Sequence, residues 1–191
     1  MSLKLKLSKF IIKLFGDVQF FSGPFFCLLW GNTHYKVRGD ESRVILNTLK
    51  KGDILTYRFD RYVSTRFIPG FWTHVALYIG DDKIIHAVTR GVVEDDILTF
   101  LRTDYVGVLR PKVSSEDIDK AVSLARGMVG KKYDFLFDSH NDERMYCSEV
   151  VRNAYPVLFA DMKEDGIPPG KFFESGVDVI HDSTVWRKKE D

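Results

Sequence analysis

The amino-acid sequence predicts an α+β fold in which a small antiparallel sheet packs against helices. Three observations lead to this prediction. The middle of the chain contains short runs of β-branched and aromatic residues separated by turn residues, which is typical of strands joined by hairpins. A segment with helical periodicity follows over about 116–129. A second short helix is predicted to begin near residue 147.

Length and composition indicate one globular domain with room for an appendage. The chain has 191 residues, of which 45% are hydrophobic and 29% are charged, an ordinary balance for a folded protein. The net charge is +1, so no overall field favours nucleic acid and we expect no nucleic-acid partner. The two cysteines, Cys27 and Cys147, are far apart and form no CxxC motif. This spacing argues against a disulfide scaffold and against a zinc site built from cysteines.

The N-terminal region, residues 1–46, is predicted to be an extension of a main domain over residues 47–191. Residues 3–15 carry apolar side chains at helical spacing with lysines off that stripe, which predicts an amphipathic helix. Such a helix either lies on an anionic membrane surface, as a peripheral contact, or packs on its own domain. The Phe-rich stretch over 20–30 is either a hydrophobic lid or part of the core.

No apolar run of about eighteen residues, the length that predicts a membrane-spanning helix, occurs in the sequence. A clean signal-peptide cleavage site is also missing. We therefore expect a cytoplasmic or peripheral membrane location rather than secretion.

The predicted strands are short and are bounded by turn residues or proline. They cover residues 54–59, 71–80, 83–88 and 105–111, with a short strand near 92–93 and another at 177–180. The second and third of these form a hairpin around Asp81-Asp82. Ser114 or Ser115 is the expected cap of the helix over 116–129, and Gly130 ends it.

Cys147 is the residue on which the functional interpretation depends. It stands at the start of the predicted helix that ends near Ala154. A thiol there meets backbone N–H groups and the positive end of the helix dipole, and both stabilise the thiolate. A thiolate becomes a catalytic nucleophile when a base and an orienting group are near it. We predict that Cys147 is a nucleophile; the alternative is a small buried hydrophobic residue.

His74 and His86 lie in the two arms of the hairpin, each in an apolar run where a polar ring needs a partner. Because side chains alternate along a strand, the two rings share a face only when paired positions sum to an even number. An odd-length loop with a bulge at Gly80 gives that register, whereas a two-residue Asp81-Asp82 loop does not. In the favourable register, His74 can act as the base and His86 can orient it.

Other roles are predicted or left open for these residues. The Cys147 N–H and the hydroxyl of Tyr57 or Tyr146 are candidate donors to substrate and oxyanion. A zinc site from His74, His86 and Cys147 is chemically allowed, and each histidine alone also fits a satisfied core residue. The remaining histidines lie in polar or unpatterned segments and are expected at the surface: His34, His140 and His181.

Several segments, in their order and spacing, resemble the circularly permuted papain-like enzymes, the YiiX/YaeF-type relatives of the NlpC cell-wall cysteine peptidases. The resemblance covers about residues 50–180. It implies a permuted papain-like fold, nucleophile Cys147, base His74 and a third polar residue at His86. We separately expect no cofactor and no catalytic metal. The segments that carry the resemblance are Gly52-Asp53-Ile54-Leu55, residues 73–80, Ile85-His86-Ala87, residues 130–134, residues 146–151 and residues 167–176.

The residue at position 86 departs from the commonest pattern of that group, which is glutamate. The spacing His74–Tyr78–His86 instead resembles the lecithin:retinol acyltransferase-like proteins, which share the permuted fold and act on lipid acyl esters through a cysteine thioester. Their Asn-Cys-Glu-His motif is absent here, where the cysteine lies in Tyr146-Cys147-Ser148-Glu149. The cysteine motif therefore favours the amidase-like group.

The expected function is a cysteine hydrolase that cleaves an amide bond, in a cell-wall peptide or an acylated amino acid, through an acyl-thioester. One alternative is a lipid acyl hydrolase or acyltransferase. Another is a non-catalytic binding domain on the same fold. The expected partner is accordingly a small-molecule, peptide or lipid substrate.

Overall fold

The structure, a computed structural model, describes residues 18–21, 27–30, 35–60, 62–137, 143–162, 165–174 and 176–189. The predicted helix over 3–15 lies outside these ranges, as do His34 and His140. In the Phe-rich stretch, β1 (Val18–Phe21) pairs antiparallel with β2 (Cys27–Trp30). Among the helices described, none combines the length and apolar character needed to cross a membrane.

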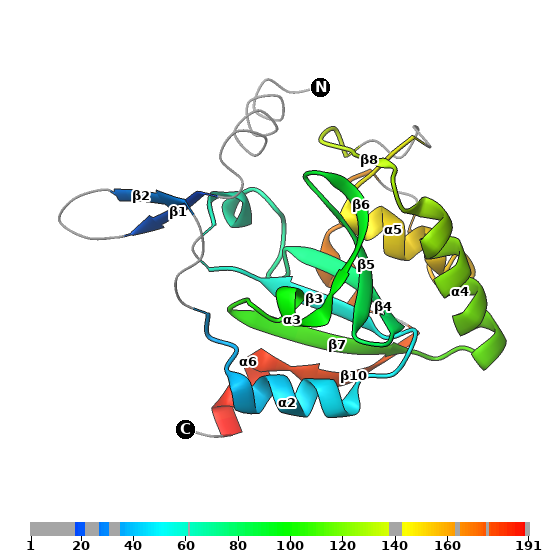
Figure 1. The fold of residues 1–191 in the computed structure, drawn as a ribbon, viewed down its shortest axis with the longest axis horizontal. Helices are drawn as coiled ribbons and strands as arrows, with labels where there is room; N and C mark the ends of the chain where they lie inside the picture. The colour runs from blue at the N-terminus through cyan, green and yellow to red at the C-terminus, as the bar shows by residue number, and fades with distance from the viewer. Residues whose placement is uncertain are drawn as a thin grey trace.

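A six-stranded antiparallel sheet forms the centre of the fold (Figure 1). It confirms the existence of the strands expected from the sequence, but some of their bounds differ. The strand expected at 71–80 begins at His74, the one near 92–93 runs through the acidic residues to Asp96, and the one at 177–180 ends at Asp182. A small parallel pair, β8 (Lys132–Tyr133) with β9 (Arg144–Met145), leads into the cysteine helix. In spatial order, the strands of the sheet are β10 (Val177–Asp182), β7 (Tyr105–Pro111), β3 (Ile54–Arg58), β4 (His74–Gly80), β5 (Lys83–Val88) and β6 (Gly91–Asp96).

Helices lie against both faces of this sheet, whereas the α+β prediction stated only that helices pack against it. On one face are α4 (Ser115–Met128) and α5 (Cys147–Ala154), and we name it the α4–α5 face (Figure 1). On the other, the α2–α3 face, are α2 (Gly39–Thr48) and α3 (Ile97–Phe100). Because strand side chains alternate, Val75 and Ala76 enter opposite cores.

Short helical segments complete the described chain. They are α6 (Ser183–Trp186), which follows β10, and the 3₁₀ turns Val63–Arg66, Pro169–Phe173 and Arg187–Lys189.

The helix expected at 116–129 is confirmed as α4, and its start shows why it forms there. The Ser114 hydroxyl accepts the backbone N–H of Asp117, a side-chain cap for one of the free N–H groups of the first turn. Its buried stripe, which packs against α5, consists of Ala121, Val122, Ala125 and Met128. Burying that stripe fixes α5, and with it Cys147, against the sheet.

Part of the predicted N-terminal extension belongs to the core. Ile45 of α2 is fully buried and shares a cluster with Leu55 of β3 and Ala76 of β4. The domain boundary at 46/47 stays a prediction, but α2 packs on the sheet that carries the histidines.

The expectation that His181 lies at the surface is wrong. Its Nε2 lies 2.9 Å from Oε1 of Glu41, and both side chains are buried. Glu41 also accepts hydrogen bonds from Ser183 and Arg187. Burial disfavours the carboxylate, but these hydrogen bonds outweigh it and hold the pKa of Glu41 below its usual value. The polar sequence around His181 therefore joins the end of the chain to α2.

Candidate active site

The tip of the β4–β5 hairpin is a two-residue turn, which is not the loop length that we expected. Gly80 pairs with Lys83, so only Asp81 and Asp82 lie between the paired positions. Both aspartates have left-handed backbone angles, with φ of 52° and 56°, as such tight turns require.

A bulge just below the tip restores the register that the histidines need. The pairing shifts between Tyr78 and Gly80, and beyond the shift Tyr78 lies opposite Ile84. Their numbers sum to an even value, so His74 and His86 have side chains on the same face. The requirement that both histidines share one face of the sheet is therefore met by a bulge combined with a two-residue turn.

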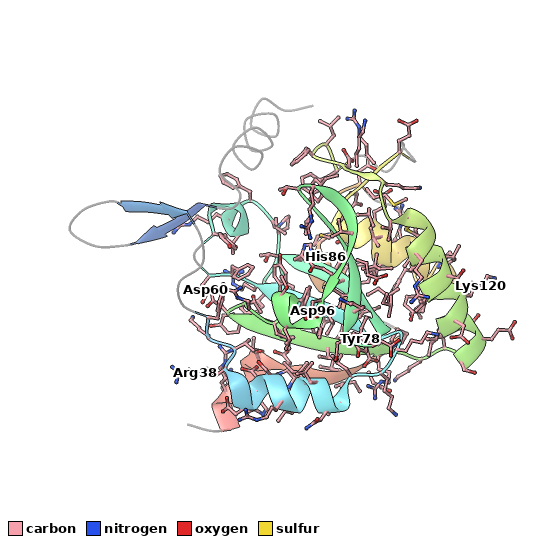
Figure 2. All side chains as sticks on the ribbon, in the orientation of Figure 1. Arg38, Asp60, Tyr78, His86, Asp96 and Lys120 are labelled. Atoms are coloured by element: carbon pink, nitrogen blue, oxygen red, sulfur yellow. The ribbon has the colours of Figure 1, made fainter. Side chains whose placement is uncertain are left out.

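His74 and His86 form a hydrogen-bonded pair on the α2–α3 face. His74 Nε2 lies 3.1 Å from His86 Nδ1, and both rings are buried (Figure 2 labels His86). Tyr57 stacks on His74 with ring centroids 4.5 Å apart and an angle of 26° between the planes. Phe100 of α3 packs against both imidazoles. The aromatic contacts hold the rings in one orientation, with Nδ1 as the His74 nitrogen outside the pair.

Burial keeps both imidazoles neutral. It lowers the pKa of His74 well below the usual value, and a proton on His86 would lower it further. It also lowers the pKa of His86; the charge of Asp95 opposes this effect, and that of Arg90 adds to it. Near neutral pH, each ring therefore carries one N–H and one lone pair.

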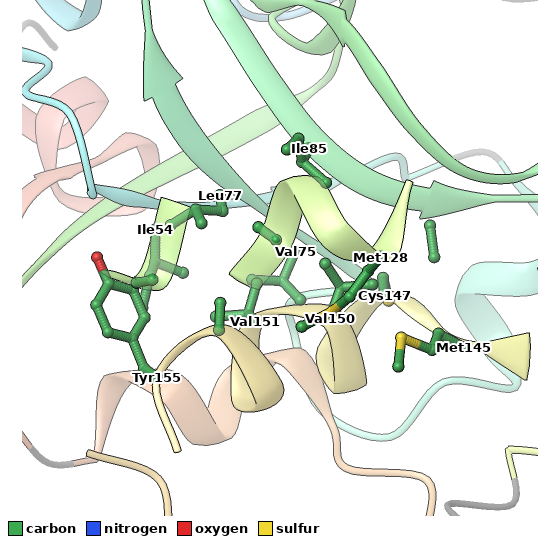
Figure 3. Close-up of a cluster of buried hydrophobic side chains, with 14 of the residues drawn as sticks. Ile54, Val75, Leu77, Ile85, Met128, Met145, Cys147, Val150, Val151 and Tyr155 are labelled. Atoms are coloured by element: carbon green, nitrogen blue, oxygen red, sulfur yellow. The ribbon is translucent and has the colours of Figure 1, made fainter. Parts of the chain in front are cut away.

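Cys147 is the first residue of α5, as predicted, and packs in the core of the α4–α5 face among Val75, Met128 and Val150 (Figure 3). Backbone N–H groups of Val75, Ser148 and Cys147 itself donate towards its sulfur. Burial has the larger effect and raises the pKa of the Cys147 thiol. The expected donors are present, but the resting side chain is a neutral thiol, which corrects the expectation of a stabilised thiolate.

Ser148 adds a second buried polar atom beside this sulfur. Its hydroxyl lies close enough to help lower the thiol pKa, yet Oγ meets no partner with hydrogen-bond geometry among the described residues. The stabilisation of the sulfur is therefore assigned to the backbone N–H groups.

The thiol and the histidine pair are both linked to the start of β4, but from opposite faces of the sheet. Val75, whose N–H reaches the sulfur, directly follows His74 in the chain. In the described residues, the ladder between β4 and β5 begins only at Leu77 and Ile85, so this N–H lies outside it. The same residues show no hydrogen bond between the Cys147 sulfur and the His74 ring. Catalytic hydrogen bonds of this kind often tighten only when substrate binds.

Asp95 is a charged neighbour of the pair that the sequence interpretation missed. Val93 of β6 lies opposite His86, so Asp95, two residues further on, shares its face. Asp95 Oδ2 is 3.7 Å from His86 Nε2, an ion-pair distance that is too long for a hydrogen bond. The same carboxylate oxygen is 3.0 Å from Arg90. Pairing β6 with β5 in register is the signal that could have identified it.

The two predicted tyrosines lie in different surroundings. Tyr57 is stacked on His74, whereas Tyr146 is almost fully buried in the α4–α5 core. The Tyr146 hydroxyl accepts the backbone N–H of Ile167, and its ring packs on Phe137. Of the two, Tyr57 is the one beside the histidine pair.

The comparison with protein families gives a match over the part of the chain that carries the candidate site. Residues 48–167, which contain the cysteine, the two histidines and Asp95, match the model of the permuted papain-like amidase enzyme, YaeF/YiiX, C92 family. The fold and the matched span together place the chain among the papain-like cysteine amidases. The chain belongs to the C92 family of permuted papain-like amidases.

The other comparisons add no relative. Neither the curated proteins nor the solved structures contain a match. No group of three His, Cys, Asp or Glu side chains in the described ranges is arranged to hold a metal ion.

Proposed function

We propose that this chain is a cysteine amidase in which Cys147 attacks the carbonyl carbon of an amide and becomes acylated. The observation that carries the proposal is the 3.1 Å contact between His74 Nε2 and His86 Nδ1. This contact occupies Nε2 of His74 and leaves its Nδ1 for proton transfer. His74 directly precedes Val75, whose backbone N–H favours the thiolate of Cys147. Nucleophile, base and orienting group are the three parts of such a site.

The resting protonation states decide how the reaction begins. With the thiol pKa raised and the His74 pKa lowered, an ion pair of thiolate and imidazolium is unfavourable before substrate binds. The proton of Cys147 therefore passes to His74 Nδ1 as the C–S bond forms, rather than in advance. The imidazolium then gives this proton to the leaving amine as the C–N bond breaks.

The second half of the reaction reverses these roles. Water attacks the thioester while His74 accepts its proton, the C–S bond breaks, and the thiolate recovers a proton from His74. The products are the free carboxylic acid and the neutral Cys147 thiol. His86 keeps the ring in place throughout, because it bonds the nitrogen that does not transfer the proton.

The oxyanion of each tetrahedral intermediate needs donors fixed in advance. The backbone N–H of Cys147 at the start of α5 is one, since the first N–H groups of a helix have no partner within it. The hydroxyl of Tyr57 is the proposed second donor, because its ring is held on His74. Tyr146 remains a weaker proposal because its hydroxyl already accepts a backbone N–H.

Trapping the acyl-enzyme tests this function. The protein is mixed with an N-acyl amino acid anilide, a cell-wall peptide or an acyl ester, quenched in acid, and weighed intact by mass spectrometry. We expect an acyl adduct, removable by hydroxylamine, that forms from an amide and is lost in Cys147→Ala. The matched control is Cys27→Ser, which removes the other thiol and should acylate normally.

Three results would count against the proposal. An adduct that persists in Cys147→Ala would place the nucleophile elsewhere. Acylation by esters alone would favour the lipid acyl hydrolase or acyltransferase. No adduct and no turnover with any of these substrates, in protein shown to be folded, would favour a binding domain.

A further inference from the structure

We propose that Asp95 is a positioning residue that decides which nitrogen of His74 carries the proton. The mechanistic consequence rests on the proposed function, but the structural claim does not. The groups involved are His74, His86, Asp95 and Arg90, from β4, β5, β6 and the turn between β5 and β6.

The contact between the two histidines can form in two ways. A neutral imidazole has one N–H and one lone pair. If His86 carries its proton on Nε2, its Nδ1 accepts, His74 Nε2 donates, and His74 Nδ1 is a bare lone pair. If His86 carries its proton on Nδ1, the bond reverses and His74 Nδ1 carries a hydrogen. Only the first arrangement lets His74 Nδ1 accept the thiol proton.

Asp95 distinguishes these arrangements. Its carboxylate faces His86 Nε2 at 3.7 Å, and among the described residues that buried nitrogen has no hydrogen-bond partner. A carboxylate attracts an N–H and repels a lone pair, and the low dielectric of a buried site strengthens both effects. The proton of His86 is therefore held on Nε2, next to Asp95, and the first arrangement is selected.

Arg90 disfavours a second proton on His86, so the carboxylate of Asp95 does not convert the ring to an imidazolium. The guanidinium lies 3.0 Å from the Asp95 oxygen that faces His86 and is itself exposed. Its positive charge opposes a second proton on His86, while the neighbouring His74 contributes no charge in its neutral form. The Asp95 carboxylate thus orients a neutral His86 imidazole. It also supplies, behind His86, the negative charge that a histidine lacks as an orienting group.

The tautomers can be observed directly by ¹H–¹⁵N long-range NMR on protein labelled at histidine nitrogens, near neutral pH. We expect both His74 and His86 to carry their proton on Nε2 in the wild type. In Asp95→Leu, we expect His86 to become a mixture of tautomers and His74 Nδ1 to gain a partial N–H. Asp95→Asn should behave closer to wild type, because its carbonyl oxygen can still accept.

The matched control is Asp96→Asn, which removes the same charge one residue along the chain. Asp96 caps α3 through its Oδ1, a role that asparagine also fills, so the fold and both tautomers should be unchanged. A wild type with a proton on His74 Nδ1, or an Asp95→Leu variant with unchanged tautomers, would overturn the proposal.

Activity provides the second measurement and separates the two proposals. If the amidase proposal holds, Asp95→Leu should lower kcat by about 10- to 100-fold, with little change in KM, the size of loss that follows removal of the group behind a metal-bound histidine. Altered tautomers in a protein that forms no acyl-enzyme would support the role of Asp95 and reject the amidase. An acyl-enzyme with unchanged tautomers in Asp95→Leu would support the amidase and reject the role of Asp95.

Discussion

The backbone N–H of Val75, the residue that follows His74 in the chain, favours the thiolate of Cys147, and the two residues pack together in the core of the α4–α5 face. This contact joins the start of α5 to the start of β4. It matters because Val75 and His74 present their side chains to opposite faces of the sheet. A thiol from the α4–α5 face thereby reaches the strand position from which the histidine pair extends.

The stacked ring of Tyr57 leads to the first prediction. If its hydroxyl stabilises the oxyanion, Tyr57→Phe should lower kcat by about 100-fold or more, because one donor to the transition state is lost while the stack on His74 remains. Tyr57→Leu should cost more, since it also frees the imidazole. Steady-state kinetics with an amide substrate would check this; a Phe variant with wild-type kcat would limit Tyr57 to packing.

The raised pKa of Cys147 gives a second prediction. In a Cys27→Ser background, the rate of alkylation by iodoacetamide should increase with pH and reach half its maximum above the free-cysteine value of about 8.5. The reason is that burial disfavours the thiolate until substrate binds. A rate that is already constant between about pH 5 and 7 would instead reveal a preformed ion pair with histidine.

Stability should depend on pH through the same two histidines. Their folded-state pKa values lie below the unfolded value of about 6.5, so the unfolded chain takes up protons first as the pH falls. Their contribution is complete above that pH and decreases below it, by about 1.4 kcal/mol per pH unit for each ring, until the folded pKa is reached.

Urea unfolding between pH 5 and 7 measures this dependence, since most carboxylates stay ionised there. The double variant His74→Gln/His86→Gln should show a correspondingly smaller slope. Equal slopes in the two proteins would mean that the rings are not held neutral by burial.

The cluster around Glu41 predicts a large loss of stability. Glu41→Ala should lower the free energy of unfolding by about 3 kcal/mol, because His181, Ser183 and Arg187 lose a buried acceptor. Glu41→Gln should cost less, since the amide oxygen accepts part of the same bonds. Urea denaturation of the two variants beside wild type would reveal this order, and an effect below about 0.5 kcal/mol for alanine would contradict the cluster's structural role.

The parts of the fold that depend on local pattern were predictable. The periodicity and the Ser114 cap locate α4, and the turn residues Asp81-Asp82 locate the hairpin. The bulge was foreseen only as a condition, because the register depends on how two strands pair and not on either strand alone. Cys147 could be placed at a helix start, but the thiol pKa could not be predicted, since burial depends on the whole core.

Contacts between distant segments could not be read from the sequence. Asp95 lies in an acidic run that resembles a turn, and only its pairing with β5 reveals that it faces His86. His181 and Glu41 are separated by 140 positions, so nothing local marks the polar sequence around His181 as buried. Both omissions share one cause: a polar residue is recognised as buried only when its partner is known.

The rate of the first acylation step in His74→Gln tests the central claim most directly. Rapid mixing with an amide substrate, read as the burst of released amine, isolates that step from later hydrolysis. We predict a burst rate about 10²- to 10⁴-fold below wild type, the usual contribution of a general base, with Cys147 still the residue that is acylated. A burst at the wild-type rate in this variant would show that His74 does not accept the thiol proton, and would contradict the account.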